Sequence, residues 1–328
     1  SVVDALATAT GAHLAWVPRR SGERGGIEAG LLPGLLPGGR PVSHPEARAQ
    51  VERAWNMGPE HGLPTSLGRD TTGILSALLE GSLGGAVVGG IDLRDFPDPG
   101  LARAALAASG FTVQLEVRRS EVSEHADVVL PVAPAVEKNG TFVNWEGRVR
   151  PFGQAHVSRA RTDRQVLGML ADEMGVDLQV DDLVVLHEQL ADLGLWRGQR
   201  PSVAFGPAPV VCAGAPVPAD GVEARLTIHK PMLDAGRLQD GEPFLAATAL
   251  RPIARVGADL AQRLSLVAGQ EVTVATATGS IILPAVVGGV SDGTVWLPEC
   301  SAGSTVHQTL GAGHGSQVTL THAAEVLR

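Results

Sequence analysis

A cluster of polar and charged side chains with defined hydrogen-bonding geometry follows a short apolar run in the segment ADVVLPVAPAVEKNGTFVNWEGR. The candidate site residues in it are Glu137, Thr141, Asn144, Glu146 and Arg148. The Arg148 guanidinium could clamp a phosphate or a carboxylate with two parallel hydrogen bonds. Asn144 and Thr141 could instead satisfy backbone groups, and Glu146 could pair with Arg148 or with a neighbouring chain.

The position of this cluster in the chain favours a site, but the residue types also suit a purely structural loop. Val128–Leu130 reads as a strand that Pro131 stops, because proline has no N–H for a sheet ladder. A loop that leaves such a strand is where α/β proteins place ligands and partner contacts. Buried polar groups in a loop more often satisfy the loop itself. We therefore favour a structural role for the two glutamates, the asparagine and the arginine.

A basic stretch begins at the end of the same segment. It contains a single acid, Asp163, among five arginines: Arg148, Arg150, Arg159, Arg161 and Arg164. A phosphate-rich ligand, an acidic partner subunit and surface ion pairs of little energetic value all explain such a stretch.

The other candidate groups point to no catalytic centre and no metal. Gly311–Gly315 lacks the spacing of a phosphate-binding loop, so a barrel loop is favoured. His307, His314 and His322 do not stand at helical zinc-ligand spacing. Cys212 and Cys300 are too few for a disulfide framework, an iron–sulfur cluster or a Cys-rich zinc site.

Composition excludes several classes of protein. The chain has 328 residues and a net charge of −9, with 3% aromatic residues and no Tyr, which argues against a nucleic-acid footprint. It has no apolar run of about 18 residues, so we expect no membrane insertion. The sequence starts inside an apparent amphipathic helix without a signal peptide, and we expect it to be the C-terminal part of a longer polypeptide.

The first half of the chain predicts an α/β fold. Helices alternating with short apolar strands imply a parallel sheet with flanking helices. The expected elements are helices at 70–80 and 98–109, strands at 84–91, 111–117 and 127–130, and a one-turn helix capped by Ser120 or Ser123. Gly25–Pro41 has too many Gly and Pro for helix or strand, and we interpret it as a buried, packed connector.

The second half predicts a helical pair, a linker and a β domain. Thr162 or Asp163 opens the first helix, whose apolar face carries Val166, Leu167, Leu170 and Met174; the second covers 181–193. Residues 196–221 are rich in Pro, Gly and Ala and read as a linker. Strands are expected at 224–229, 253–256, 271–276, 280–287, 294–297 and 317–321, with a helix at 257–264. The predicted domains are 1–160, 161–221 and 222–328.

Two motifs resemble a known superfamily. The chain resembles the molybdopterin oxidoreductases in two segments. The first contains ADVVLP followed by a Glu, GT and N-x-EGR, and the second is GADLAQRLSLVAGQEVTVATATGSIILPAVV. Within this superfamily, EKNGTFVNWEGR is similar to the family of G subunits of bacterial NADH-quinone oxidoreductase, respiratory complex I. The resemblance implies a Rossmann-like α/β domain followed by a double-psi β-barrel.

The same resemblance implies that the chain is a cofactor-free structural segment of the peripheral arm of complex I. This arm is expected on the cytoplasmic side of the bacterial plasma membrane, and the expected partners are other peripheral-arm subunits. Iron–sulfur clusters are implied only in the absent N-terminal part. Cys300 stands where relatives often carry Asn near the cofactor's nucleotide end, and Arg150 where many carry Gln, so the vestigial site predicts no dinucleotide binding. The alternative is the C-terminal half of a genuine molybdopterin oxidoreductase, such as a formate dehydrogenase.

Overall fold

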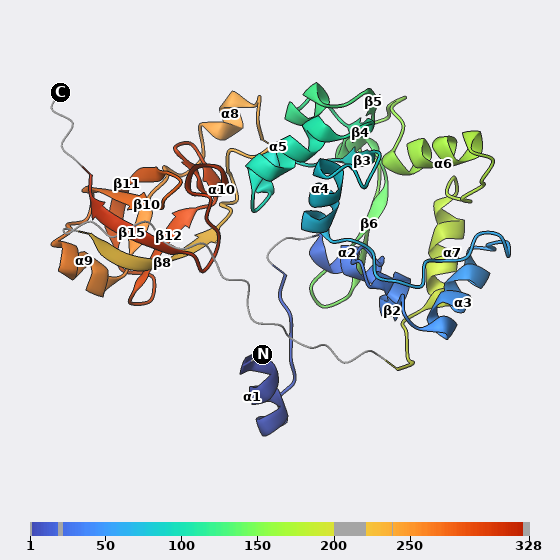
Figure 1. Ribbon diagram of the computed structural model, residues 1–328, viewed down its shortest axis with the longest axis horizontal. Helices are drawn as coiled ribbons and strands as arrows, with labels where there is room; N and C mark the ends of the chain where they lie inside the picture. Colours follow the sequence, from blue (N-terminus) through green and yellow to red (C-terminus); the bar gives the residue numbers. More distant parts are fainter. Residues whose placement is uncertain (1, 19–21, 200–220, 238, 324–328) are drawn as a thin grey trace. The chain divides into compact units, whose positions relative to one another are not determined.

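The computed structural model describes residues 2–18, 22–199, 221–237 and 239–323, which form two compact units (Figure 1). The first unit contains α1–α4, β1–β7, α6 and α7; the second contains η2, α5, η3 and everything described from β8 onward. Most of the predicted 196–221 linker, including Cys212, lies outside the described residues, and the predicted domain boundaries stay a prediction. Within the described ranges, no helix has the length and apolar character needed to cross a bilayer.

A three-stranded parallel sheet organises the first unit, as the sequence predicts. Its strands, in the order β3-β4-β5, are Ala86–Gly89, Thr112–Glu116 and Val128–Pro131. Helix α4 (Thr71–Leu79) lies within the predicted helix at 70–80, and its N-cap is Asp70, whose carboxylate accepts a hydrogen bond from the Gly73 N–H at 2.8 Å. Helix α5 (Pro99–Ala108) follows β3 in the chain. The predicted α/β class is confirmed.

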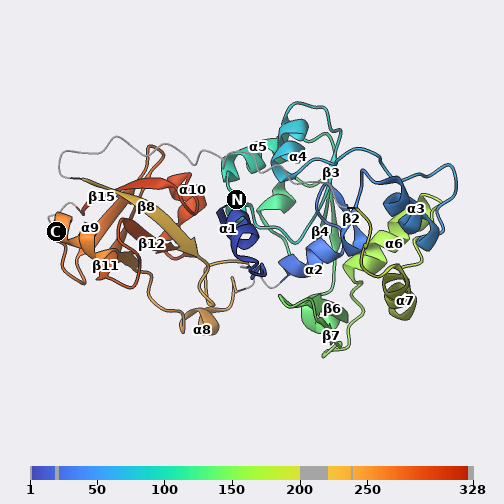
Figure 2. The same cartoon turned by 90° about the horizontal axis from the view of Figure 1, so that it is seen from below.

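The segment after β5 is not the predicted loop. Pro131 closes β5 as its last residue, which is tolerated because β5 is an edge strand. The 3-10 helix η4 (Ala135–Glu137) then leads into an antiparallel hairpin of β6 (Gly140–Val143) and β7 (Val149–Phe152). This hairpin lies at the periphery of the first unit, next to α2 (Figure 2). A hairpin is favoured over an open loop because two short strand-like segments flank an Asn-Trp-Glu-Gly turn.

The prediction that Gly25–Pro41 holds neither helix nor strand is also wrong. It contains most of α2 (Glu23–Glu28), the short strands β1 (Leu35–Leu36) and β2 (Arg40–Pro41), and η1 (Pro37–Gly39) between them. An ion pair one helical turn apart, between Arg24 Nη2 and Glu28 Oε1 at 2.7 Å, stabilises α2 despite its two glycines. The packing is uneven, because Leu31 is 78% exposed whereas Leu36 is buried.

The remaining helices of the first unit are α1 (Val2–Thr10), α3 (Pro45–Ala54), α6 (Asp163–Glu173) and α7 (Leu183–Leu193). Helix α6 has a capping box, in which Thr162 and Gln165 each bond the other's backbone N–H, so the predicted start is confirmed. The predicted apolar face is buried only at Val166. Its other members, Leu167, Leu170 and Met174, are 44%, 38% and 81% exposed.

A buried guanidinium joins three of these segments. The Arg40 side chain is 3% exposed and donates from Nε to Gln50 Oε1 of α3 at 3.0 Å. Its Nη1 donates to the carbonyl oxygens of Pro37 and Gly194 at 3.0 and 2.8 Å, and Nη2 donates to the carbonyl of Leu193. The last two carbonyls lie at the C-terminal end of α7, where a positive charge is favourable. Arg40 therefore holds η1, α3 and α7 together.

A closed six-stranded barrel forms the core of the second unit. Its strands are β8 (Val222–His229), β9 (Ala254–Val256), β10 (Glu271–Ala275), β11 (Ser280–Val287), β12 (Thr294–Pro298) and β15 (Gln317–His322). The remaining elements are η2 (Leu93–Asp95), η3 (Glu121–Glu124), α8 (Pro243–Ala246), α9 (Ala258–Leu264), β13 (Cys300–Ser301), β14 (Ser304–Thr305) and α10 (Val306–Leu310). The structure adds α8, β13, β14 and α10 to the predicted elements.

The strand pairing has an internal two-fold symmetry. The first half, β8, β9, α9 and β10, corresponds to the second half, β11, β12, α10 and β15. Exchanging the halves converts the parallel pair β8–β12 into β11–β9, and the antiparallel pair β8–β15 into β11–β10. The pairs β9–β12 and β10–β15 map onto themselves. This symmetric pairing is that of the expected double-psi β-barrel.

The barrel interior matches the predicted alternation. Val272 and Val274 of β10 are fully buried, and their partners Leu283 and Ile281 on β11 are 6% and 3% exposed. The turn between these strands is closed by a hydrogen bond from the Thr276 N–H to the Gly279 carbonyl at 2.9 Å. Closure leaves the barrel without a free sheet edge.

We expect Arg40→Met to lower the free energy of unfolding of the first unit by roughly 2–4 kcal/mol, because it leaves buried carbonyl groups without donors. Urea unfolding followed by circular dichroism measures the change. Arg53→Met is the matched control: Arg53 lies on α3, is 65% exposed and forms an ion pair with Glu46. A loss no larger than that of the control would contradict the bridging role of Arg40.

Candidate functional site

Three of the predicted site residues build the turn of the β6–β7 hairpin. The Asn144 Oδ1 accepts hydrogen bonds from the backbone N–H groups of Glu146 and Arg148, at 3.1 and 2.8 Å. Gly147 has φ +83°, which favours glycine, and its N–H donates to the Asn144 carbonyl at 2.9 Å. The Arg148 Nε lies 3.0 Å from Glu146 Oε2. The Asn-x-Glu-Gly-Arg motif thus satisfies its own backbone and charges.

The other two candidates in this segment also contact their own unit. The Thr141 Oγ1 lies 3.2 Å from Nε2 of His187, which links β6 to α7. Glu137 ends η4, and its carbonyl accepts a hydrogen bond from Gln154 Nε2 at 3.0 Å. The five residues are therefore close along the hairpin, but these hydrogen bonds run to the hairpin and to α7 rather than toward one common point.

Part of the basic stretch is neutralised locally. Asp163, the one acid inside it, does not contribute to this through its ion pair at 2.7 Å, which joins it to Lys138 Nζ outside the stretch. Arg148 is paired with Glu146 in the hairpin turn. The backbone carbonyl of Arg161 accepts a hydrogen bond from the Ala133 N–H at 2.7 Å, so this part of the stretch is anchored beside the end of β5.

Cys300 belongs to the second unit and is buried. Burial raises the pKa of its thiol above the ordinary value of 9.0, and the positive charge of Arg94 opposes that rise. The Cys300 carbonyl accepts a hydrogen bond from the Ala235 N–H at 3.0 Å. A neutral thiol in this setting is a small packing group and not a nucleophile.

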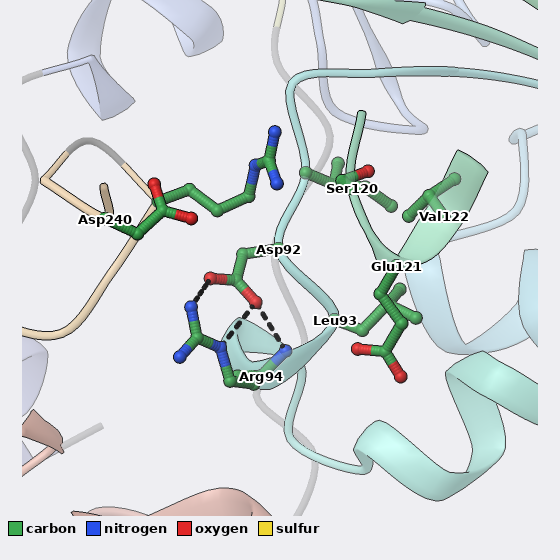
Figure 3. A pocket seen from close by; sticks show the side chains of 9 residues that line it. Asp92, Leu93, Arg94, Ser120, Glu121, Val122 and Asp240 are labelled. Atoms are coloured by element: carbon green, nitrogen blue, oxygen red, sulfur yellow. Dashed lines mark hydrogen bonds and ion pairs between the residues drawn. The ribbon is translucent and has the colours of Figure 1, made fainter. Parts of the chain in front are cut away.

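An aspartate–arginine pair, Asp92 and Arg94, lies near Cys300 in the second unit and is shown in Figure 3. Arg94 donates to Asp92 from Nη2 at 2.7 Å, and from Nε and its backbone N–H at 3.0 Å each. Burial alone raises the pKa of the Asp92 carboxyl, but the hydrogen bonds from Arg94 outweigh it, so this pKa lies below its ordinary value. Lys230 is likewise paired with Asp95.

The pair borders a polar pocket of about 230 Å³. The pocket is lined by Ile91, Asp92, Leu93, Arg94, Ser120, Glu121, Val122, Arg237 and Asp240. Figure 3 shows its three carboxylates and the Arg94 guanidinium. Glu121 is in addition bound by Arg103. Acidic groups thus accompany the positive ones in the wall.

Sequence reasoning missed this pair, and also a buried polar face on the central strand β4. Thr112, Gln114 and Glu116 occupy alternate positions and are 0%, 1% and 6% exposed. The Glu116 Oε1 accepts a hydrogen bond from the Val117 N–H at 2.9 Å. The signal was available, because polar residues at every second position of a central strand are unusual.

Among the described residues, no group of three or more His, Cys, Asp or Glu side chains is arranged to hold a metal ion. Two members of the histidine trio have separate partners. The His307 Nε2 lies 3.5 Å from Glu299 Oε1, and His322 Nε2 lies 2.6 Å from the Leu264 carbonyl.

Comparison with known proteins identifies the relatives of this sequence. The family model of molybdopterin oxidoreductases matches residues 87–173. The G subunit of NADH-quinone oxidoreductase from Mycobacterium bovis is 48% identical over 96% of the chain, which covers 39% of that protein. The corresponding subunit from Streptomyces coelicolor is 46% identical over 95% of the chain and 37% of its own length. The chain thus spans about two fifths of the length of these curated relatives.

The formate dehydrogenase type of relative is more distant. A putative formate dehydrogenase of Bacillus subtilis is 30% identical, but over only 45% of this chain and 15% of its own length.

Positive side chains near Cys300 already have acidic partners, which argues against their binding the phosphates of the molybdopterin dinucleotide that this superfamily implies. A dinucleotide carries two phosphates, which guanidinium and ammonium groups bind through charge-assisted hydrogen bonds. In the neighbourhood of Cys300, Arg94 is bound by Asp92 and Lys230 by Asp95. Cys300 itself offers neither the donors nor the acceptor of an amide.

The turn geometry predicts that Asn144 matters more than Arg148 for stability. Asn144→Ala removes an acceptor used by two backbone N–H groups and should lower the free energy of unfolding by about 1 kcal/mol. Arg148→Ala removes one exposed ion pair and should cost less than about 0.5 kcal/mol. Chemical unfolding of both variants measures the difference. The reverse order would mean that Arg148, not the turn, is the important element.

The Asp92–Arg94 pair predicts a pH dependence. Because the folded pKa of Asp92 lies below its ordinary value of 3.8, the pair stabilises the fold fully above that value. The contribution is lost as the pH falls through the lowered folded pKa. Asp92→Asn should therefore cost roughly 1–3 kcal/mol near neutral pH, and the difference from wild type should shrink as the pH falls below 3.8. Asp172→Asn, at an exposed position, is the control; a pH-independent difference for Asp92→Asn would contradict the assignment.

Proposed function

Because the chain belongs to the family of NADH-quinone oxidoreductase G subunits, we propose that it is a structural segment of such a subunit, without a redox cofactor of its own. In this role it builds part of the peripheral arm of respiratory complex I and buries surface against other peripheral-arm subunits. The complex as a whole transfers electrons from NADH to a quinone and couples this to ion pumping. The iron–sulfur clusters that carry the electrons lie in other parts of the full subunit and complex.

One observation carries this proposal: the polar residues that suggest a site in the sequence form hydrogen bonds and ion pairs within the fold itself. Asn144 binds two backbone N–H groups of its own turn, and Glu146 binds Arg148. In the second unit, Arg94 is held by Asp92. Binding a phosphate or a pterin would compete with these contacts, so a scaffold role suits the side chains better than catalysis.

The proposed location is the cytoplasmic side of the bacterial plasma membrane, as part of a membrane-bound complex. Attachment there comes from contacts with neighbouring subunits, and the segment takes no nucleic acid. This agrees with the net charge of −9, which disfavours binding to polyanions.

Metal analysis of the assembled complex tests the proposal. We expect iron in the purified complex but no stoichiometric molybdenum or tungsten. Either of these metals at one equivalent per subunit would overturn the cofactor-free assignment.

A buried charge in the barrel core tests the scaffold role. Val272 is fully buried in β10, so Val272→Asp should unfold the barrel and reduce the amount of assembled complex. Turnover of NADH per assembled complex should stay within about twofold of wild type, because the segment takes no part in the reaction. Ile282→Asp, at a 49% exposed position of the neighbouring strand, is the control. Normal assembly with a collapsed turnover would contradict the scaffold role.

A further inference from the structure

The β6–β7 hairpin has one face against its own unit and one face turned away. Successive residues of a strand point to opposite faces. Val143 lies against Gly25 of α2, so the face that contains Val143 is the packed one. Phe142 and its cross-strand partner Arg150 are on the opposite face, where Phe142 is 51% exposed.

Aromatic side chains are organised on this outer face. The rings of Phe142 and Phe152 have centroids 5.1 Å apart and planes tilted by 31°. Phe152 lies across Gly140, where a β-carbon would come within 2.7 Å of its ring. Glycine at this position therefore permits the ring to lie flat along the hairpin. In the turn between the two strands, Trp145 is 50% exposed. We call Phe142, Trp145, Arg150 and Phe152 the hairpin surface.

The contact between Phe142 and Phe152 stabilises the hairpin, but it leaves Phe142 51% and Trp145 50% exposed. The turn is fixed by Asn144 and Gly147, and within the part of the chain that the structure describes the Trp145 side chain makes no hydrogen bond to it. A two-stranded hairpin gains little from aromatic groups that stay half exposed to water. Trp, Phe and Arg are enriched at the centres of protein–protein interfaces, where their burial contributes most of the affinity.

The charge of the surface specifies the partner. Glu146 neutralises Arg148, whereas Arg150 makes no ion pair with any residue that the structure describes. The hairpin thus presents one unneutralised guanidinium beside an aromatic pair, on a chain with a net charge of −9. A guanidinium in this position favours a carboxylate through two parallel hydrogen bonds.

We propose that the hairpin surface docks a polypeptide segment of a neighbouring subunit, one that carries a carboxylate next to an apolar side chain. The proposal rests on the proposed function, because it requires an assembly of several subunits. The apolar side chain packs on Phe142 and Trp145, and the carboxylate pairs with Arg150. Of the three explanations for the basic stretch, this proposal favours an acidic partner subunit, with the contact at Arg150.

Crosslinking in the assembled complex identifies the occupant. With Trp145 replaced by the photoreactive residue p-benzoylphenylalanine, irradiation should join the hairpin to a different subunit, at a segment that contains Asp or Glu. Crosslinks to lipid, to nucleic acid or to a second copy of this chain would overturn the proposal, as would no crosslink at all in an assembled complex.

Affinity measurements test the contacts. Phe142→Ser and Arg150→Glu should each weaken retention of the subunit in the complex by about tenfold or more, while Arg150→Lys retains much of the binding. The deficit of Arg150→Glu should shrink as salt increases. Val157→Ser and Arg251→Glu, both at exposed positions outside the surface, are the controls. Circular dichroism melting confirms that each variant is folded.

The outcomes separate the two proposals. If the wild-type chain does not copurify with other complex I subunits, the proposed function fails and this inference fails with it. If the wild type copurifies but the hairpin variants are retained as well as the controls, only the docking inference is overturned.

Discussion

The buried guanidinium of Arg40 is the constraint on which the first unit depends most. Burial lowers the pKa of this group, yet it stays charged, and among the residues that the structure describes it has no carboxylate partner. It is tolerated because four acceptors surround it, two of them at the end of α7. The backbone has adapted to this arrangement: Gly38 has φ +71°, and a β-carbon there would lie 2.3 Å from the Gly194 carbonyl. Sequence positions about 150 residues apart are thereby fixed to one another.

Features with local signals could be predicted from the sequence, and features that depend on distant contacts could not. Asp70 and the Thr162–Gln165 capping box indicate helix starts because their side chains bond backbone groups a few residues away. In the structure, Asp70 and Thr162 are the N-caps of α4 and α6. The alternation of Val272 and Val274 likewise gives the inner face of a strand. In contrast, β1, η1 and β2 depend on Arg40 reaching α3 and α7, and no short window of sequence contains those partners.

The candidate site shows the same division. Residue types identified Glu137, Thr141, Asn144, Glu146 and Arg148 as polar groups with defined geometry, but type does not reveal what a side chain binds. The Asn144 amide accepts from its own turn, and Thr141 lies beside His187 of a helix far along the chain. Asp92 and Arg94 were overlooked because two residues apart they look like ordinary surface charges; only their burial makes the pair notable.

The barrel's strand order has a consequence for how the chain is made. The last strand, β15, pairs with both the first and the third, β8 and β10. During translation every preceding strand leaves the ribosome before the ring can shut, and about ninety residues separate the two strands that finally meet at Gln317 and Arg225. Until then β8 and β10 each present an unpaired ladder to water, a state in which strands from separate nascent chains can pair. A chain whose synthesis stops shortly before Gln317 would lack β15, and its β8 and β10 would stay unpaired along these edges.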